Sequence, residues 1–174
     1  AFSSSTTGAG TVTVTGGLLL LQTGAGGADS ATVQGTKQFA LGTGTLIFKG
    51  RIAAYADGTI YGDFQPRGLA NGTDRNNAIE FISASPTSVK ARTVASGVAT
   101  ETTVAIGETI YSFGPYYQIV ATSAQVKFYV NGALVATHTT NIPTTPLNIL
   151  LTTSDGGAGN TPLYVSNVSF MRRE

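Results

Sequence analysis

The segment from Gln125 to Ala136, QVKFYVNGALVA, has the pattern of a β-hairpin. Its apolar residues recur at every second position from Val126 to Val130, which places them on one face of a strand and the polar residues on the other. The pair Asn131-Gly132 follows, and both residues tolerate the positive φ angles of a type I′ turn. An apolar run then resumes, so the segment predicts two antiparallel strands joined by a two-residue turn.

The same period of two recurs elsewhere in the chain. In residues 45–55, TLIFKGRIAAY, apolar side chains alternate with Lys49 and Arg51, and residues 89–93 show the same alternation. No ten-residue stretch keeps the 3.6-residue period of an amphipathic helix free of interruption. We therefore predict an all-β fold, a sandwich of two antiparallel sheets with many short strands. Turn-forming sequences separate the strands at Asp57-Gly58, Asn71-Gly72, Ser96-Gly97, Gly114-Pro115 and Asp155-Gly156-Gly157.

Composition excludes several classes of protein. The 174 residues are 41% hydrophobic and only 11% charged, with 22 glycines, no cysteine and a net charge of +1. This balance argues against nucleic acid or an anionic membrane as a partner, because either requires a basic excess. The absence of cysteine excludes a disulfide scaffold and a thiol nucleophile. The longest apolar run, Leu18–Leu21, is far shorter than the roughly 20 residues that span a bilayer, so we expect no membrane insertion.

Residues 1–36 differ from the rest of the chain, since they are mostly Gly, Ala, Ser and Thr with almost no charge. Such a composition is typical of an extended arm, although the alternating segment Thr11–Thr15 and the run Leu18–Leu21 could form short strands packed on the arm's own domain or on a neighbouring subunit. We predict an arm at 1–36 that contacts copies of the chain or other proteins, followed by a β-sandwich at 37–174. Deletion of the arm is then expected to leave the sandwich folded. The apolar residues expected to make the contacts are Val12, Val14, Leu18, Leu19, Leu20 and Leu21.

The residues that carry enzyme chemistry are few. The single histidine, His138, lies among threonines and is expected at the surface, and no Gly-x-Ser-x-Gly nucleophile motif is present. Glu80 lies in the strand-like segment 78–83, where its same-face neighbours Ala78 and Ile82 are apolar. Glycoside hydrolysis requires two carboxyl groups close together. We therefore predict a non-enzymatic protein without catalytic residues.

Oxygen-bearing side chains gather in two turn regions. Asp and Asn are typical turn residues, and neither region has the sequence spacing of a dedicated calcium-binding loop. Oxygen ligands on a flexible loop nevertheless suit Ca²⁺. We predict no metal site and no cofactor, with calcium as the alternative. The residues concerned are Asp57, Asp63, Asn71, Asp74, Asn76 and Asn77 in one region, and Asp155 and Asn160 in the other.

A glycan site requires an aromatic platform beside amide, carboxylate and arginine groups. Two loop regions supply such groups, although the tyrosines could equally pack at strand ends with their hydroxyls in water. The candidate glycan-binding residues are Tyr61, Arg67, Asn71, Asp74, Arg75, Asn76, Tyr116 and Tyr117.

Three segments resemble the concanavalin A-like jelly rolls. Residues 116–143, YYQIVATSAQVKFYVNGALVATHTTNIP, are similar to the back-sheet hairpin of that superfamily, and residues 162–170 to its closing strand. Residues 77–82, NAIEFI, resemble the strand that carries the catalytic carboxylates in the laminarinase-like members, with their Glu-x-Asp-x-Glu signature reduced to Glu80. The resemblance implies a jelly-roll β-sandwich of two antiparallel sheets, preceded here by the extended N-terminal arm.

The order of these motifs over residues 37–172 is most similar to lectin-like domains of bacteriophage virion proteins. That resemblance implies a structural protein of the virion surface, such as a fibre, receptor-binding or decoration component. Its partners would be other virion proteins, copies of itself and a host cell-surface glycan, and no nucleic acid. Two alternatives stay open: a secreted bacterial carbohydrate-binding module, and a degenerate glycoside hydrolase centred on Glu80.

Overall fold

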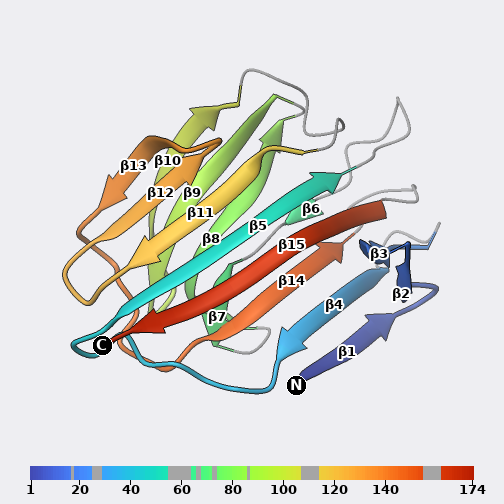
Figure 1. The fold of residues 1–174 in the computed structure, drawn as a ribbon, viewed down its shortest axis with the longest axis horizontal. Coiled ribbons are helices and arrows are strands. Elements are labelled where there is room, and N and C mark those ends of the chain that lie inside the picture. The colour runs from blue at the N-terminus through green and yellow to red at the C-terminus, as the bar shows by residue number, and fades with distance from the viewer. Residues whose placement is uncertain are drawn as a thin grey trace.

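In a computed structural model, the chain forms two antiparallel β-sheets (Figure 1). The structure describes residues 1–16, 18–24, 29–54, 64–65, 68–71, 74–85, 87–106, 114–154 and 162–174. Within these ranges no residue is helical, and hence no helix could cross a membrane. The prediction of an all-β sandwich is confirmed.

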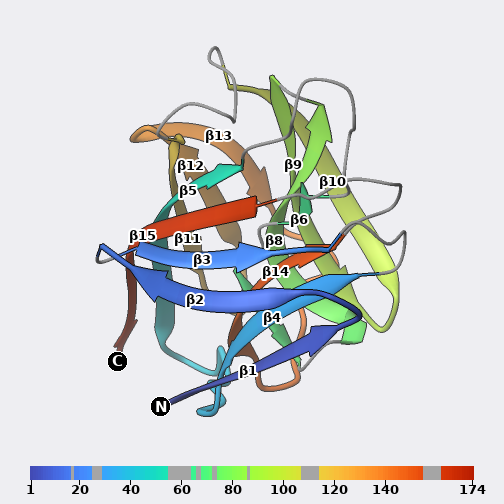
Figure 2. The same cartoon turned by 90° about the vertical axis from the view of Figure 1, so that its right-hand side faces the viewer.

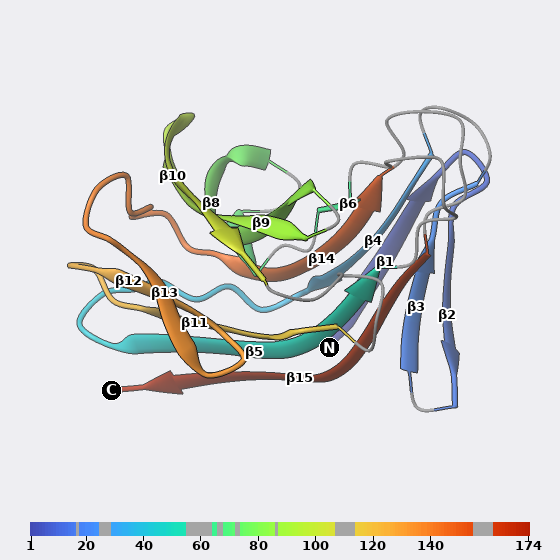
Figure 3. The same cartoon turned by 90° about the horizontal axis from the view of Figure 1, so that it is seen from above.

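The two sheets lie face to face as layers (Figure 3). The eight-stranded sheet runs in the order β1 (Phe2–Thr7), β4 (Ser30–Gly35), β14 (Asn148–Ser154), β7 (Leu69–Asn71), β8 (Asp74–Ser85), β9 (Ser88–Ala95) and β10 (Val98–Ala105), with β6 (Phe64–Gln65) beside β14. The seven-stranded sheet runs in the order β13 (Ala133–His138), β12 (Val126–Val130), β11 (Tyr116–Ala121), β5 (Thr45–Ala54), β15 (Pro162–Arg173), β3 (Leu18–Gln22) and β2 (Thr11–Thr15).

The hairpin expected at Asn131-Gly132 is present. β12 and β13 pair antiparallel up to Val130 and Ala133, and the two turn residues have φ angles of 50° and 83°. β9 and β10 are joined in the same way by Ser96-Gly97, with φ angles of 50° and 82°. Both pairs of positive φ angles are those of a type I′ turn, whose twist matches that of the strands it connects.

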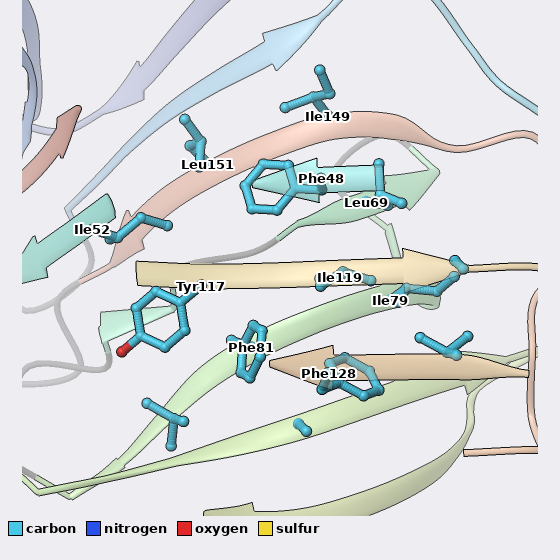
Figure 4. Packing of buried hydrophobic residues seen from close by; sticks show 14 of the residues in the cluster. Phe48, Ile52, Leu69, Ile79, Phe81, Tyr117, Ile119, Phe128, Ile149 and Leu151 are labelled. Carbon is cyan, nitrogen blue, oxygen red and sulfur yellow. The ribbon is translucent and has the colours of Figure 1, made fainter. Parts of the chain in front are cut away.

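Aromatic rings from both sheets meet in the core (Figure 4). Phe81 of β8 lies with its ring centroid 4.8 Å from that of Tyr117 and 5.3 Å from that of Phe128. All three side chains are at most 2% exposed. Large buried rings contribute most of the area removed from water in such a core, so these contacts hold β8 against β11 and β12.

The core also requires one glycine. A Cβ at Gly68 would lie 2.5 Å from the Ile119 side chain and 3.0 Å from the Ile79 carbonyl oxygen. The chain entering β7 therefore passes too close to the interior for any side chain.

Residues 1–36, expected to be an arm, contribute β1–β4 to both sheets (Figure 2). β4 is an inner strand, since it pairs with β1 on one side and β14 on the other. Leu21, Ala31 and Val33 are at most 7% exposed and belong to the same hydrophobic cluster as the rest of the core. The boundary at 36/37 therefore does not separate an arm from a sandwich, because the segment supplies core residues and an inner strand.

The residues expected to make intermolecular contacts have different environments. Leu21 is fully buried, and Val12 and Leu19 pack against the core. Leu18 and Leu20 are partly buried, while Val14, near the end of β2, is 75% exposed. Leu21 is therefore unavailable for a contact with another molecule, and Val14 is the most exposed of the set.

Candidate functional site

A row of charged side chains crosses three neighbouring strands on the outward face of the eight-stranded sheet. Arg92 of β9 lies between Glu80 of β8 and Glu101 of β10. Its Nη1 is 3.1 Å from Glu80 Oε1, and its Nε is 3.2 Å from Glu101 Oε1. Lys90 Nζ extends the row, 2.8 Å from Glu101 Oε2. We call Glu80, Arg92, Glu101 and Lys90 the charged row.

Strand register explains why these residues meet. Glu80 and Glu101 are each directly opposite Arg92, so their Cβ atoms lie about 5 Å from that of the arginine. The Ser96-Gly97 turn fixes the second pair, because Arg92 and Glu101 lie the same distance before and after it. Sequence reasoning considered only carboxylates on the strand of Glu80 and therefore missed Arg92 and Glu101. Counting outward from the Ser96-Gly97 turn could have found the pair.

The charged row is buried at one end and accessible at the other. The Glu80 side chain is 1% exposed and that of Arg92 19%, whereas Glu101 and Lys90 are 34% and 38% exposed. Beside Glu80 lies a small apolar cluster on the same outward face. Its members, at most 1% exposed, are Ala70, Ala78, Val94 and Leu150. Glu80 is thus a buried carboxylate on the same face as this apolar cluster, and Arg92 is one of its partners.

The predicted glycan-binding residues are divided between the two sheets. Asn71 ends β7, where it is partly buried, and Asn76 is an exposed residue of β8. Tyr116 and Tyr117 belong to β11 in the other sheet. Tyr117 is 1% exposed and packs on Phe81, so its ring offers no stacking face to a ligand. Tyr61 and Arg67 lie outside the described residues, as do the side chains of Asp74 and Arg75 in β8.

His138 lies inside the sandwich rather than at the surface. It is 3% exposed, its ring centroid is 5.1 Å from that of Phe128, and it reaches across to the opposite sheet. Its Nδ1 is 3.1 Å from the Thr93 hydroxyl and its Nε2 is 2.9 Å from the Thr102 hydroxyl. Because Thr93 donates to the Thr140 carbonyl, the network assigns the imidazole proton to Nδ1 and makes Nε2 the acceptor.

Burial lowers the pKa of His138 below its ordinary value of 6.5. The unfolded chain therefore binds a proton at a higher pH than the folded chain, and stability falls as the pH drops through 6.5 towards the folded pKa. We expect the urea midpoint to decrease between about pH 7.5 and about pH 5. In the variant His138→Gln, the part of this fall in the urea midpoint that comes from protonation of the imidazole should be absent. An identical pH profile in both proteins would contradict the buried, neutral imidazole.

Half of the residues considered for calcium lie outside the part of the chain that the structure describes. Asp57, Asp63, Asp155 and Asn160 lie outside the described residues. Asn77 lies in β8 and accepts a hydrogen bond at 3.2 Å from the amide of Ser96, at the turn between β9 and β10. In the part of the chain that the structure describes, no three His, Asp or Glu side chains are grouped closely enough to hold a metal ion.

No protein-family profile matches the chain, and no curated protein matches its sequence. Solved structures do match its fold. The Bacillus licheniformis β-glucanase superposes with a TM-score of 0.68 and 17% identity over 93% of this chain and 82% of the enzyme. The Bacteroides ovatus mixed-linkage glucan GH16 protein in complex with a G4G4G3G product has a TM-score of 0.72 and 11% identity over 98% and 94%. An alginate lyase from a Corynebacterium species has a TM-score of 0.66 and 10% identity over 93% and 81%.

These matches identify the fold as the concanavalin A-like jelly roll, as the resemblance implied. The prediction of a non-enzymatic protein is contradicted, because the chain shares its fold with carbohydrate-active enzymes. That prediction looked for a second carboxylate only on the strand of Glu80, whereas Glu101 approaches the same arginine from β10. The resemblance to phage lectin-like domains in particular has no support from these structures, none of which is a virion protein.

Proposed function

We propose that the chain is a divergent carbohydrate-active enzyme, with its site on the outward face of the eight-stranded sheet and Glu80 at the centre of that site. The observation that carries the proposal is the charged row, which sets Glu80 and Glu101 on either side of Arg92. The likeness to a β-glucanase, a GH16 glucan protein and an alginate lyase supports a polysaccharide as the substrate class.

The spacing of the two carboxylates bears on the chemistry. β8 and β10 are two strands apart, which is about 9–10 Å between their backbones, and both glutamates lean towards Arg92. Retaining glycosidases hold their carboxyl groups about 5–5.5 Å apart and inverting ones about 6.5–9.5 Å. Because both glutamates contact the same guanidinium, their carboxyl groups lie closer together than the two backbones.

Arg92 defines what Glu80 can do. The Arg92 guanidinium lies within ion-pair distance of Glu80, and such a partner stabilises negative charge on a carboxyl group. A carboxylate in apolar surroundings stabilises the positive charge of an oxocarbenium-like transition state, or activates a water molecule as a base. Glu101, paired with Arg92 and Lys90, is the second carboxylate of the proposed site.

The expectations of a virion-surface location, of virion partners and of a host cell-surface glycan stay predictions. The fold neighbours favour the alternative of a divergent hydrolase centred on Glu80 over a structural role in a virion.

The test is turnover of soluble polysaccharides. Mixed-linkage β-glucan, β-1,3-glucan and alginate are incubated with the wild-type chain, and new reducing ends and unsaturated products are measured. We expect turnover of at least one polymer, and a loss of about 10²-fold or more in Glu80→Gln, which keeps the shape of the side chain. Glu174→Gln, a change of an exposed terminal carboxylate, should have no effect.

Each variant is checked for a cooperative thermal transition, and Glu80→Asp retains the carboxylate should the amide variant fail to fold. The absence of turnover across the panel by the folded wild-type chain would contradict the proposal. Undiminished turnover by folded Glu80→Gln would contradict it as well.

A further inference from the structure

The charged side chains are distributed unequally between the two sheets. Within their bounds, the seven strands from β13 to β2 contain no Asp and no Glu. The same strands carry five of the ten basic residues of the chain, and the net charge of +1 conceals this separation. The five basic residues are Lys49, Arg51, Lys127, Arg172 and Arg173.

Four of these cations lie on the outward face of the seven-stranded sheet, among them Arg173, which is opposite Thr45 at the end of β15. In β5 the buried residues Phe48 and Ile52 alternate with Lys49 and Arg51, which therefore point away from the core. Lys127 alternates in the same way with the buried residues of β12. Every ion pair recorded among the described side chains belongs to the charged row on the other sheet. In the same part of the chain, Lys49, Arg51 and Lys127 have no carboxylate partner.

Tyrosines lie beside these cations. Arg51 is directly opposite Tyr116 of β11, and Lys49 is opposite Gln118, which is in turn opposite Tyr129 of β12. Tyr164 of β15 is 37% exposed on the same face. These strands lie in front of the other sheet in Figure 1 and form the lower layer in Figure 3. A tyrosine ring is apolar on its face and polar at its hydroxyl, so it packs on a sugar ring while remaining partly in water.

From this arrangement we propose that the outward face of the seven-stranded sheet binds a uronate-containing polysaccharide. Arg51 and Lys49 would bind sugar carboxylates, an interaction for which the planar guanidinium is well suited. Tyr116 and Tyr129 would pack on the rings between them, and Gln118 would hydrogen-bond the hydroxyls. The choice of a polysaccharide rests on the proposed function. The choice of an acidic one rests on the charges alone, because a neutral glycan would leave these cations without a partner.

This surface is separate from the charged row, since the two lie on opposite outer faces of the sandwich. It would hold an acidic polymer against the protein, while chemistry at Glu80 takes place on the other face. The two proposals can therefore fail independently.

Affinity electrophoresis in native gels tests the surface. The full chain is run through gels that contain polygalacturonate, or the same polymer after methyl esterification, which removes its charge. We expect retardation by polygalacturonate that decreases with added salt, and little retardation by the ester. The double variant Lys49→Gln/Arg51→Gln should weaken binding about tenfold or more, because it removes two of the four outward cations. The matched control Lys37→Gln removes an exposed cation that lies outside both the seven-stranded sheet and the charged row, and should have no effect.

Three results would overturn the proposal. They are the absence of retardation by polygalacturonate, an equal loss of binding in Lys37→Gln, and tighter binding of a single-stranded oligonucleotide than of polygalacturonate. Glu80→Gln should retain its retardation, which separates this surface from the proposed catalytic site.

Discussion

Removal of residues 1–36 is expected to leave a chain that does not fold. The deletion takes away β4, an inner strand of the eight-stranded sheet, and β3, which pairs with β15 in the other sheet. It also removes Leu21, Ala31 and Val33 from the core. Each buried Leu or Val contributes about 1.5–3 kcal/mol, against a total stability of about 5–15 kcal/mol for a domain. Far-UV circular dichroism and urea titration of residues 37–174 should show no cooperative transition.

A matched pair of substitutions separates loss of the core from loss of an external contact. Leu21→Ala changes a fully buried residue and should destabilise the chain by about 2–5 kcal/mol, whereas Val14→Ala changes a residue that is 75% exposed and should be nearly neutral. A truncated chain that unfolds cooperatively would establish residues 37–174 as an independent domain after all.

Replacement of Arg92 by methionine is expected to destabilise the protein by about 3–5 kcal/mol, because it leaves the buried Glu80 carboxylate without its guanidinium. Methionine fills much of the volume of the arginine stem, so the loss of packing is small. The free energy of unfolding from urea titration near neutral pH measures the effect.

Lys90, two residues from Arg92 on the same face of β9, provides the control for this variant. Lys90→Met removes an ion pair whose partners are about one third exposed, so we expect a loss of no more than about 1 kcal/mol. In the double variant Glu80→Gln/Arg92→Met, much of the stability lost in Arg92→Met should return, because no buried charge is left unpaired. Equal losses in Arg92→Met and Lys90→Met would contradict the structural importance of the buried pair.

The fold class and its central hairpin could be predicted from the sequence because both depend on local patterns. The two-residue period of β12 and the turn at Asn131-Gly132 require no knowledge of distant residues. The N-terminal segment could not be placed in this way. Its Gly- and Thr-rich composition is compatible with a linker, and only pairing of β4 with β14, more than a hundred residues away in the chain, makes it part of the sandwich.

The candidate site depends more on the pairing of distant strands than the fold class or the central hairpin does. Glu80 was recognised as a candidate, but its surroundings are determined by the register that aligns it with Arg92 and Arg92 with Glu101. His138 appeared to be a surface residue because threonines surround it in sequence. Two of its hydrogen-bond partners are threonines of the opposite sheet, Thr93 and Thr102, and the strand sequence of β13 alone contains no sign of them.

The central claim is that the chain acts on a glycan at the charged row. Amide chemical shifts of the isotope-labelled chain, recorded during titration with a mixed-linkage glucan tetrasaccharide, test it most directly. We expect the largest changes in β8, β9 and β10 around Glu80, Arg92 and Glu101. Changes confined to the seven-stranded sheet, or no change at a saturating concentration of the sugar, would contradict a glycan site at Glu80.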